Sequence, residues 1–410
     1  MNGSTSGGAS SSSGGGSSGA SGSSSGSSGA SSGSSGSAPI PPQPRGPYAG
    51  RVGTTDVSIL YPLPGPGEIA TFVRPSEVGN HGALFAAADF ATVLSGHTGL
   101  ERTSSSPASG YANLGLVGVR LDPCSARRGP GTCTSEARLV FQALDTTMSG
   151  TTALDGGLHV VYDVTETELV DMAQEILTLK KANGDLALQE LAPHPILAAQ
   201  GLGGAFATGL RSIVLFHLGS ERVARATAFD HNMDPDSDGW TFASFERVGG
   251  ALTPHAIPFL KSHQQTIAGS AATTENLVTE SHATAFSNGG PDDVQAILSP
   301  GRTETGITPD MRAAFAAALR VENPGVHDAE TTTCGNCHLA EGATRIGKAF
   351  GLPEAGAFTN PRSLARVDQR TSVTNLHAFG YLGRQVSIMQ RTANESVLVA
   401  DRIAALLTAR

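Results

Sequence analysis

The chain has 410 residues, with 27 Lys and Arg against 36 Asp and Glu, so its formal net charge is −9. This acidic balance, without any block of five or more basic residues, excludes a nucleic-acid-binding protein. No run of about 18 apolar residues occurs, so the sequence predicts no transmembrane segment. At about 150 residues per domain, the length allows two or three domains.

Residues 1–48 are predicted to form a flexible tether. The first 37 residues include 19 Ser and 12 Gly and carry no charge, so they cannot bury enough apolar area to offset the entropy of ordering. Five prolines between Pro39 and Pro47 follow as a stiffer stretch. This tail resembles the tether that follows the lipidated cysteine of exported bacterial lipoproteins. The alternative is a low-complexity insertion without a function.

The printed chain has no cationic segment followed by an apolar one at its start, and therefore no signal peptide. It also has no cysteine in the tail that could carry a lipid. We therefore expect the signal peptide and a lipid anchor upstream of Met1. The resemblance implies a periplasmic or cell-surface protein.

Residues 49–300 are predicted to form an α+β domain of unknown purpose. Runs rich in β-branched and aromatic residues predict strands at 115–121, 137–143, 158–162, 212–217, 224–229 and 240–248. Helical spacing of apolar residues predicts helices at 165–181 and 195–207. Three strands, two helices and three strands in this order favour an α+β domain over alternating βαβ units.

Cys124 and Cys133 are predicted to form a disulfide bond. Eight residues lie between them, including the turn-forming sequence Gly129-Pro130-Gly131, and strand-like runs flank the segment. The alternative is a pair of reduced thiols. A disulfide requires an oxidising compartment, which indicates a location outside the cytoplasm.

Asp234, Asp236 and Asp238, followed by Gly239, have the spacing of carboxylates in a calcium-binding loop. The twelfth position of such a loop is Phe245 rather than an acidic residue, and Glu246 comes one residue later. The flanking runs are strand-like, whereas helices flank the usual calcium loop. A solvated acidic hairpin loop is therefore the favoured interpretation, with calcium binding as the alternative.

The sequence Cys334-Gly335-Asn336-Cys337-His338 is the C-x-x-C-H signature of c-type haem attachment. Two thiols three residues apart on a helical turn reach the two vinyl groups of one porphyrin, and the next imidazole then binds the iron as the proximal ligand. With four Cys and 12 His in the chain, chance produces this pattern about once in a thousand such sequences. The alternatives are a redox-active dithiol and a metal site, but zinc needs four ligands, and the other two cysteines lie far away in the sequence.

Residues 301–410 resemble a mono-haem class I cytochrome c. A helix starting at Pro309 precedes the motif, and a capping box at Thr392 and Glu395 precedes a C-terminal helix with an apolar stripe. The resemblance implies a small all-α domain holding one haem c. Two departures are that Pro324-Gly325 ends the first helix well before Cys334, and that the last helix lacks the aromatic residue usual at the helix crossing.

The family places a methionine ligand on a loop before the last helix, and Met389 occupies that place here. His377 is the rival distal ligand, and an open sixth position is the third alternative. Met389 can equally be a core residue, because methionine fills apolar gaps. Filled axial positions imply electron transfer, whereas an open one allows chemistry on a bound molecule.

We therefore expect a tether at 1–48, an α+β domain at 49–300 and a cytochrome c-like domain at 301–410. The expected function is electron transfer to or from a redox partner protein. One alternative is a haem-dependent oxidoreductase whose substrate site lies in the middle domain. Another is a non-catalytic, haem-bearing surface lipoprotein.

Overall fold

The computed structural model describes residues 51–97, 107–129, 132–147, 150–185, 190–232, 239–268, 309–360 and 375–410. The predicted tether, the three aspartates of the predicted calcium loop and the predicted domain boundary at residue 300 lie outside these ranges. The described residues, from 51 to 410, belong to one compact unit. Elements on either side of residue 300 are therefore parts of the same unit.

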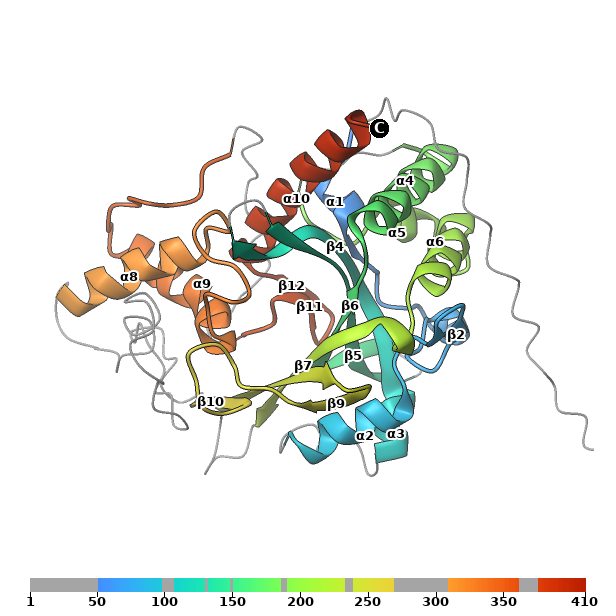
Figure 1. Ribbon diagram of the computed structural model, residues 1–410, viewed down its shortest axis with the longest axis horizontal. Coiled ribbons are helices and arrows are strands. Elements are labelled where there is room, and N and C mark those ends of the chain that lie inside the picture. Colours follow the sequence, from blue (N-terminus) through green and yellow to red (C-terminus); the bar gives the residue numbers. More distant parts are fainter. Residues whose placement is uncertain are drawn as a thin grey trace, which may run out of the picture. The chain divides into compact units, whose positions relative to one another are not determined.

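The described residues contain an eight-stranded antiparallel sheet, which fills the centre of Figure 1. The strand order is β1-β4-β5-β6-β7-β8-β10, and β9 also pairs with β8. The strands are β1 (Ser58–Leu60), β4 (Leu114–Gly129), β5 (Thr132–Thr147), β6 (Gly150–Asp163), β7 (Val223–Asn232), β8 (Gly239–Val248), β9 (Ala251–Pro254) and β10 (Gln264–Ala268). Five of the six predicted strands are confirmed, as β4, β5, β6, β7 and β8.

Both faces of this sheet carry buried apolar side chains, and the larger apolar cluster takes residues from both, such as Val140 and Phe141 of β5. On β6, Leu158 and Tyr162 belong to the larger cluster. On β7 and β8, Phe229, Trp240 and Phe242 belong to a second cluster. Because alternate residues of a strand point to opposite faces, these two groups of residues mark a first face and a second face of the sheet.

Helices α4 and α6 pack against the first face, and short helices flank them (Figure 1). The elements of this region are α1 (Thr54–Val57), η1 (Ile69–Thr71), β2 (Val78–Gly79), β3 (Gly82–Ala83), α2 (Ala87–Ser95), α3 (Pro107–Asn113), α4 (Glu166–Asn183), α5 (Pro195–Gln200), α6 (Ala205–His217) and η3 (Ser220–Arg222). The predicted helix at 165–181 is confirmed as α4, which Thr165 and Glu168 start with a capping box.

Two predictions in this region were wrong. The predicted helix at 195–207 is two helices, because the chain breaks at Gly201, which has φ +72°, a value that favours glycine. The predicted strand at 212–217 is the end of α6. Its buried residues Phe206, Leu210, Ile213 and Val214 have helical spacing, which a short apolar run read on its own conceals.

The chain after residue 308 covers the second face with α8 (Pro309–Val321), α9 (Cys334–Ala349), β11 (Phe379–Leu382), β12 (Gln385–Ile388) and α10 (Gln390–Thr408). The expectation of an all-α region is corrected by the antiparallel pair β11 and β12. Gly380 and Gly383 both have positive φ values, which lets this short hairpin form. The Phe379 ring lies over Gly118, where a Cβ would be 2.6 Å from the ring.

Helix α10 also departs from its predicted start. It begins at Gln390 with Met389 as N-cap, so Thr392 and Glu395 lie inside the helix and form no capping box. Tertiary contacts accompany this change: Oε2 of Glu341 accepts from the Gln390 N–H at 3.0 Å at the helix start, and Glu395 pairs with Arg120 of β4 at 2.5 Å. The predicted apolar stripe is confirmed, since Val397, Ile403 and other stripe residues are buried. None of the described helices combines the length and apolar character needed to cross a membrane.

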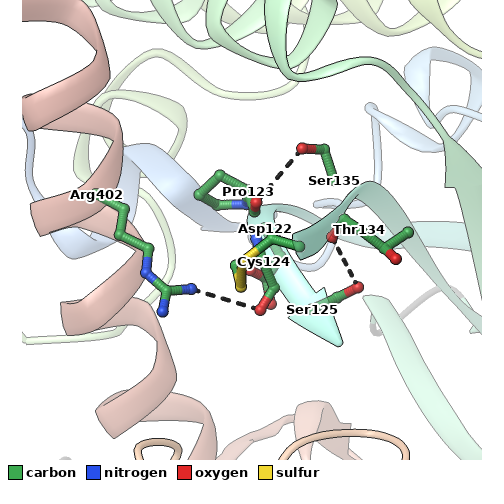
Figure 2. The surroundings of a disulfide bond; sticks show 8 residues. Asp122, Pro123, Cys124, Ser125, Thr134, Ser135 and Arg402 are labelled. Atoms are coloured by element: carbon green, nitrogen blue, oxygen red, sulfur yellow. Dashed lines mark hydrogen bonds between the residues drawn. A yellow bond between two sulfur atoms is a disulfide. The ribbon is translucent and has the colours of Figure 1, made fainter. Parts of the chain in front are cut away.

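The predicted disulfide bond between Cys124 and Cys133 is confirmed. It joins β4 to β5 near their hairpin end, as Figure 2 shows. The Ser125 hydroxyl donates to the Thr134 carbonyl oxygen at 3.2 Å, which ties the same two strands together. Arg402 of α10 donates to the carbonyl oxygen of Cys124 at 3.5 Å. The disulfide therefore sits where the hairpin meets the last helix.

The first face holds a buried imidazole that makes stability depend on pH. His194 is fully buried, its ring stacks on Phe206 with centroids 4.5 Å apart, and neither ring nitrogen has a hydrogen-bond partner among the described residues. Burial, with a smaller effect of the Lys180 ammonium, lowers the pKa of His194 to about 3. Below an unfolded-state pKa of about 6.5, the unfolded chain binds a proton that the folded chain excludes.

We predict that acid destabilises the protein through His194, with the loss starting below about pH 6.5 and continuing towards pH 3. In His194→Phe, which keeps the stacking, the loss of unfolding free energy between pH 7 and pH 5 should shrink by about 2 kcal/mol. Urea titrations of both proteins at the two pH values measure this difference. An unchanged pH dependence in the variant would show that His194 is not buried in its neutral form.

Candidate functional site

Both thiols of the C-x-x-C-H motif lie on the first turn of α9. The helix begins at Cys334, and the Thr333 hydroxyl oxygen caps it by accepting from the backbone N–H of Asn336 at 3.1 Å. Residues three apart on a helix share one face, so Cys334 and Cys337 lie side by side along it. Both are free cysteines and partly buried. The local structure thus has the arrangement that the sequence predicted for the motif.

The residues just before and within the motif contact β10. The Gly335 N–H donates to Oε1 of Gln265 at 2.8 Å, and Nε2 of Gln265 donates to the Thr333 hydroxyl oxygen at 3.4 Å. A Cβ on Gly335 would be 2.6 Å from Cδ1 of Ile267. A larger residue at this position would displace the side chains of Ile267 and Gln265, so glycine suits the close approach of α9 to the sheet.

His338 has the hydrogen bond expected of a metal-ligating histidine. Its Nδ1 contacts the carbonyl oxygen of Leu376, and because a carbonyl only accepts, Nδ1 must carry the proton. This bond fixes the ring orientation and assigns the lone pair of the neutral ring to Nε2. Ligating histidines commonly hold their second nitrogen in this way, which also raises their basicity.

Aromatic side chains of the second face form the floor beneath His338. Its ring centroid lies 4.7 Å from that of Phe242 and 5.9 Å from that of Phe229. Phe229 stands opposite Phe242 in the register of β7 and β8. Gly157 of β6 makes room for Phe229, because a Cβ there would be 2.5 Å from the ring. The sole tryptophan, Trp240, belongs to the same apolar cluster.

The two candidate distal ligands lie in the same region. His377 is buried, with ring centroids 5.4 Å from Phe229 and 5.2 Å from Trp240, and its Nδ1 lies 2.8 Å from Oδ1 of Asn375. Met389 is 1% exposed and belongs to the cluster that contains Phe229 and Phe242, with Cys334 packed against it. Met389 therefore lies in the apolar cluster whose Phe242 contacts His338, although the two residues are 51 positions apart in the sequence.

A buried network of charges lies beside Cys337. Burial acts to raise the pKa of Glu395, but Arg120 and Arg391 outweigh it and hold that pKa at about 2. Burial and the neighbouring Glu395 raise the pKa of Asp122 to about 7. Arg120 also lies over the Phe379 ring, with the guanidinium carbon 5.6 Å from the centroid. This network joins β4 to α10, and it places the carboxylates of Asp122 and Glu395 close to guanidinium groups.

The thiols of the motif are kept protonated. Burial, and then the neighbouring Cys337, raise the pKa of Cys334 to about 12. Burial also raises the pKa of Cys337, with opposing effects from Arg391 and Glu395. A dithiol that exchanges with disulfides needs a lowered pKa, so these surroundings do not favour one.

The described residues contain no cluster of three or more His, Cys, Asp or Glu side chains arranged to hold a metal ion. The predicted calcium ligands Asp234, Asp236 and Asp238 lie outside the described residues, but β7 and β8, which flank them, confirm the strand-like flanks. Sequence reasoning missed Gln265 and Leu376. It also missed the aromatic floor, although alternate aromatic residues at 240 and 242 carry that signal.

Comparisons of the chain with protein-family models, with curated proteins and with solved structures find no match.

The residues present fit a covalently held c-type haem. Two unjoined thiols share one helical turn, the next imidazole has its Nδ1 bound to a carbonyl, and apolar and aromatic side chains surround them. Cys334 and Cys337 would form the two thioether bonds, and His338 would bind the iron through Nε2.

We predict that Cys334 and Cys337 of the haem-free protein react slowly with iodoacetamide at pH 8. For Cys334, a pKa raised from about 9 to about 12 lowers the thiolate fraction roughly a thousandfold at this pH, and only the thiolate attacks. The pKa of Cys337 is raised as well, so its reaction is also slowed. Mass spectrometry of quenched samples compares the native protein with protein unfolded in urea, without reductant, so that Cys124 and Cys133 stay bonded. Equal rates in the two states would contradict the burial of these thiols and would reopen the dithiol alternative.

Proposed function

We propose that the chain is a c-type haem protein that transfers electrons. The observation that carries the proposal is the bond from Nδ1 of His338 to the Leu376 carbonyl oxygen, made by the histidine of a C-x-x-C-H turn. A histidine with a purely structural role would not require two free cysteines just before it at the start of a helix. This combination supports haem over the dithiol and zinc alternatives.

The chain's own residues have separate roles in this proposal. Cys334 and Cys337 hold the cofactor, and His338 provides the proximal nitrogen. Phe229 and Phe242 exclude water from the face of the imidazole, because they are buried in the same cluster. The Leu376 carbonyl keeps the proton at Nδ1. When bound, haem supplies a one-electron couple whose potential depends on its axial ligands and on burial.

We propose Met389 as the distal ligand. Its side chain is buried in the motif's apolar cluster, and its length and flexibility let the sulfur adapt to a bound group. Methionine and histidine together fill both axial positions, which suits electron transfer to a redox partner protein.

The enzyme alternative has less support. A cavity of about 770 Å³ lies beside the disulfide, lined by residues that include Thr134, Glu166 and Arg402. Its lining includes no residue of the motif or of the aromatic floor. A substrate bound there would not contact the proposed haem site.

We further propose that the protein is exported and anchored at the cell surface or in the periplasm. The disulfide between Cys124 and Cys133 supports an oxidising compartment. Attachment of haem to the motif requires the same side of the membrane. The Ser- and Gly-rich tail suits a tether between an upstream lipid anchor and the compact unit.

We predict covalent haem when the full chain is expressed with an export signal and the cytochrome c maturation machinery. Peroxidase-type staining should survive a denaturing gel, and it should disappear in the Cys334→Ala/Cys337→Ala double variant. Cys124→Ser/Cys133→Ser is the matched control, because it also removes two cysteines and should retain the stain. An unstained, folded and exported protein would remove the haem proposal.

We predict that Met389→Leu loses the sulfur-to-iron charge-transfer band of the ferric protein and lowers the reduction potential, since methionine ligation raises it. Met172→Leu is the control, because Met172 is equally buried but lies on α4, outside the apolar cluster that contains Met389. Absorption spectra and potentiometry measure both effects. A spectrum that changes in His377→Phe but not in Met389→Leu would make His377 the distal ligand instead.

A further inference from the structure

We propose that Gln265 is a positioning residue for haem attachment. It belongs to the large sheet, far from the motif in sequence, and it fixes the helical turn that presents both thiols. The inference rests on the proposed function, and it assigns to strand β10 of the sheet a role in positioning the two thiols.

The contacts of Gln265 are specific to the motif. The side chain is fully buried, and its amide bonds two groups of the helix start, accepting from Gly335 N–H at 2.8 Å and donating to Thr333 at 3.4 Å. Thr333 in turn donates its hydroxyl hydrogen to Oδ1 of Asn336 at 2.5 Å and accepts from that residue's N–H at 3.1 Å. One side chain of β10 therefore holds the turn from just before Cys334 to just before Cys337.

The first N–H groups of a helix have no partner within the helix. The Gly335 N–H is one of them, and Gly335 is buried, so water does not readily replace Gln265. Without this acceptor, the N–H is left unsatisfied or the first turn unwinds. Unwinding moves Cys334 relative to Cys337, and the pair then loses the spacing that matches one porphyrin. The absence of a Cβ at Gly335 serves the same contact, because it lets the turn reach β10.

Gln142 of β5 provides a matched control. It is 1% exposed, accepts from the Tyr381 N–H at 2.8 Å and donates to the Tyr381 carbonyl oxygen at 2.9 Å. Like Gln265, it is a buried glutamine that accepts from a backbone N–H, but its partner is on β11 and not on α9. Gln142 also donates to the Leu154 carbonyl oxygen at 3.5 Å, so truncation of Gln142 removes at least as many hydrogen bonds as truncation of Gln265.

The experiment expresses the full chain with an export signal and the haem maturation machinery, and compares wild type with Gln265→Ala, Gln265→Glu and Gln142→Ala. Pyridine haemochrome spectra give haem per protein, and peptide mass spectrometry gives the thioether occupancy at Cys334 and at Cys337 separately. Gln265→Ala should lower the doubly attached fraction at least threefold and leave protein attached through one cysteine. Gln142→Ala should keep both thioethers in whatever protein folds.

Gln265→Glu should restore most of the double attachment. Its carboxylate still accepts from Gly335, and a negative charge is favourable at a helix N-terminus. Equal, complete double attachment in Gln265→Ala and wild type would overturn the positioning role while leaving the proposed function intact. Equal losses in Gln265→Ala and Gln142→Ala would also overturn it, because stability alone would then explain them. Wild type without covalent haem would remove both proposals.

Discussion

Burial of both faces of one antiparallel sheet is the constraint on which the structure depends. Antiparallel sheets commonly leave one face to water, and alternate residues are then polar. Here Phe229, Trp240 and Phe242 make the second face apolar as well, so it requires a cover. Helix α9, the β11–β12 hairpin and α10 provide this cover. The C-x-x-C-H motif is therefore contacted by residues from before position 300, such as Gln265 and Phe242.

Sequence reasoning predicted the long strands because alternation and β-branched residues are strong signals over many positions. It failed where the decisive interaction was distant. Glu395 suits a capping box locally, but Arg120 of β4 binds it inside α10. The run at 212–217 suits a strand locally, but it continues a helical stripe that starts at Phe206. The β11–β12 hairpin was missed because it depends on the positive φ values of Gly380 and Gly383, which cannot be read from the sequence.

At the site, the C-x-x-C-H motif was readable from the sequence because the chemistry proposed for it depends on short spacing. The residues that contact the motif could not be predicted from the sequence in this way. Leu376 contributes only a backbone carbonyl to His338, which any residue type possesses. Gln265 lies 70 residues before Gly335 and meets it only because β10 is the outer strand at that end of the sheet order. Such partners depend on strand order, and strand order is set by the whole fold.

The contact between the start of β1 and α10 has a consequence for how the chain folds. The Ser58 and Ser396 hydroxyls lie 2.7 Å apart although 338 positions separate them in the chain. Contacts of such long range slow folding, because loop-closure entropy is lost before they form. During synthesis, the second face of the sheet stays uncovered until nearly the whole chain has emerged. An unfinished chain thus exposes an aromatic surface, which makes it prone to aggregate until the last helix has packed.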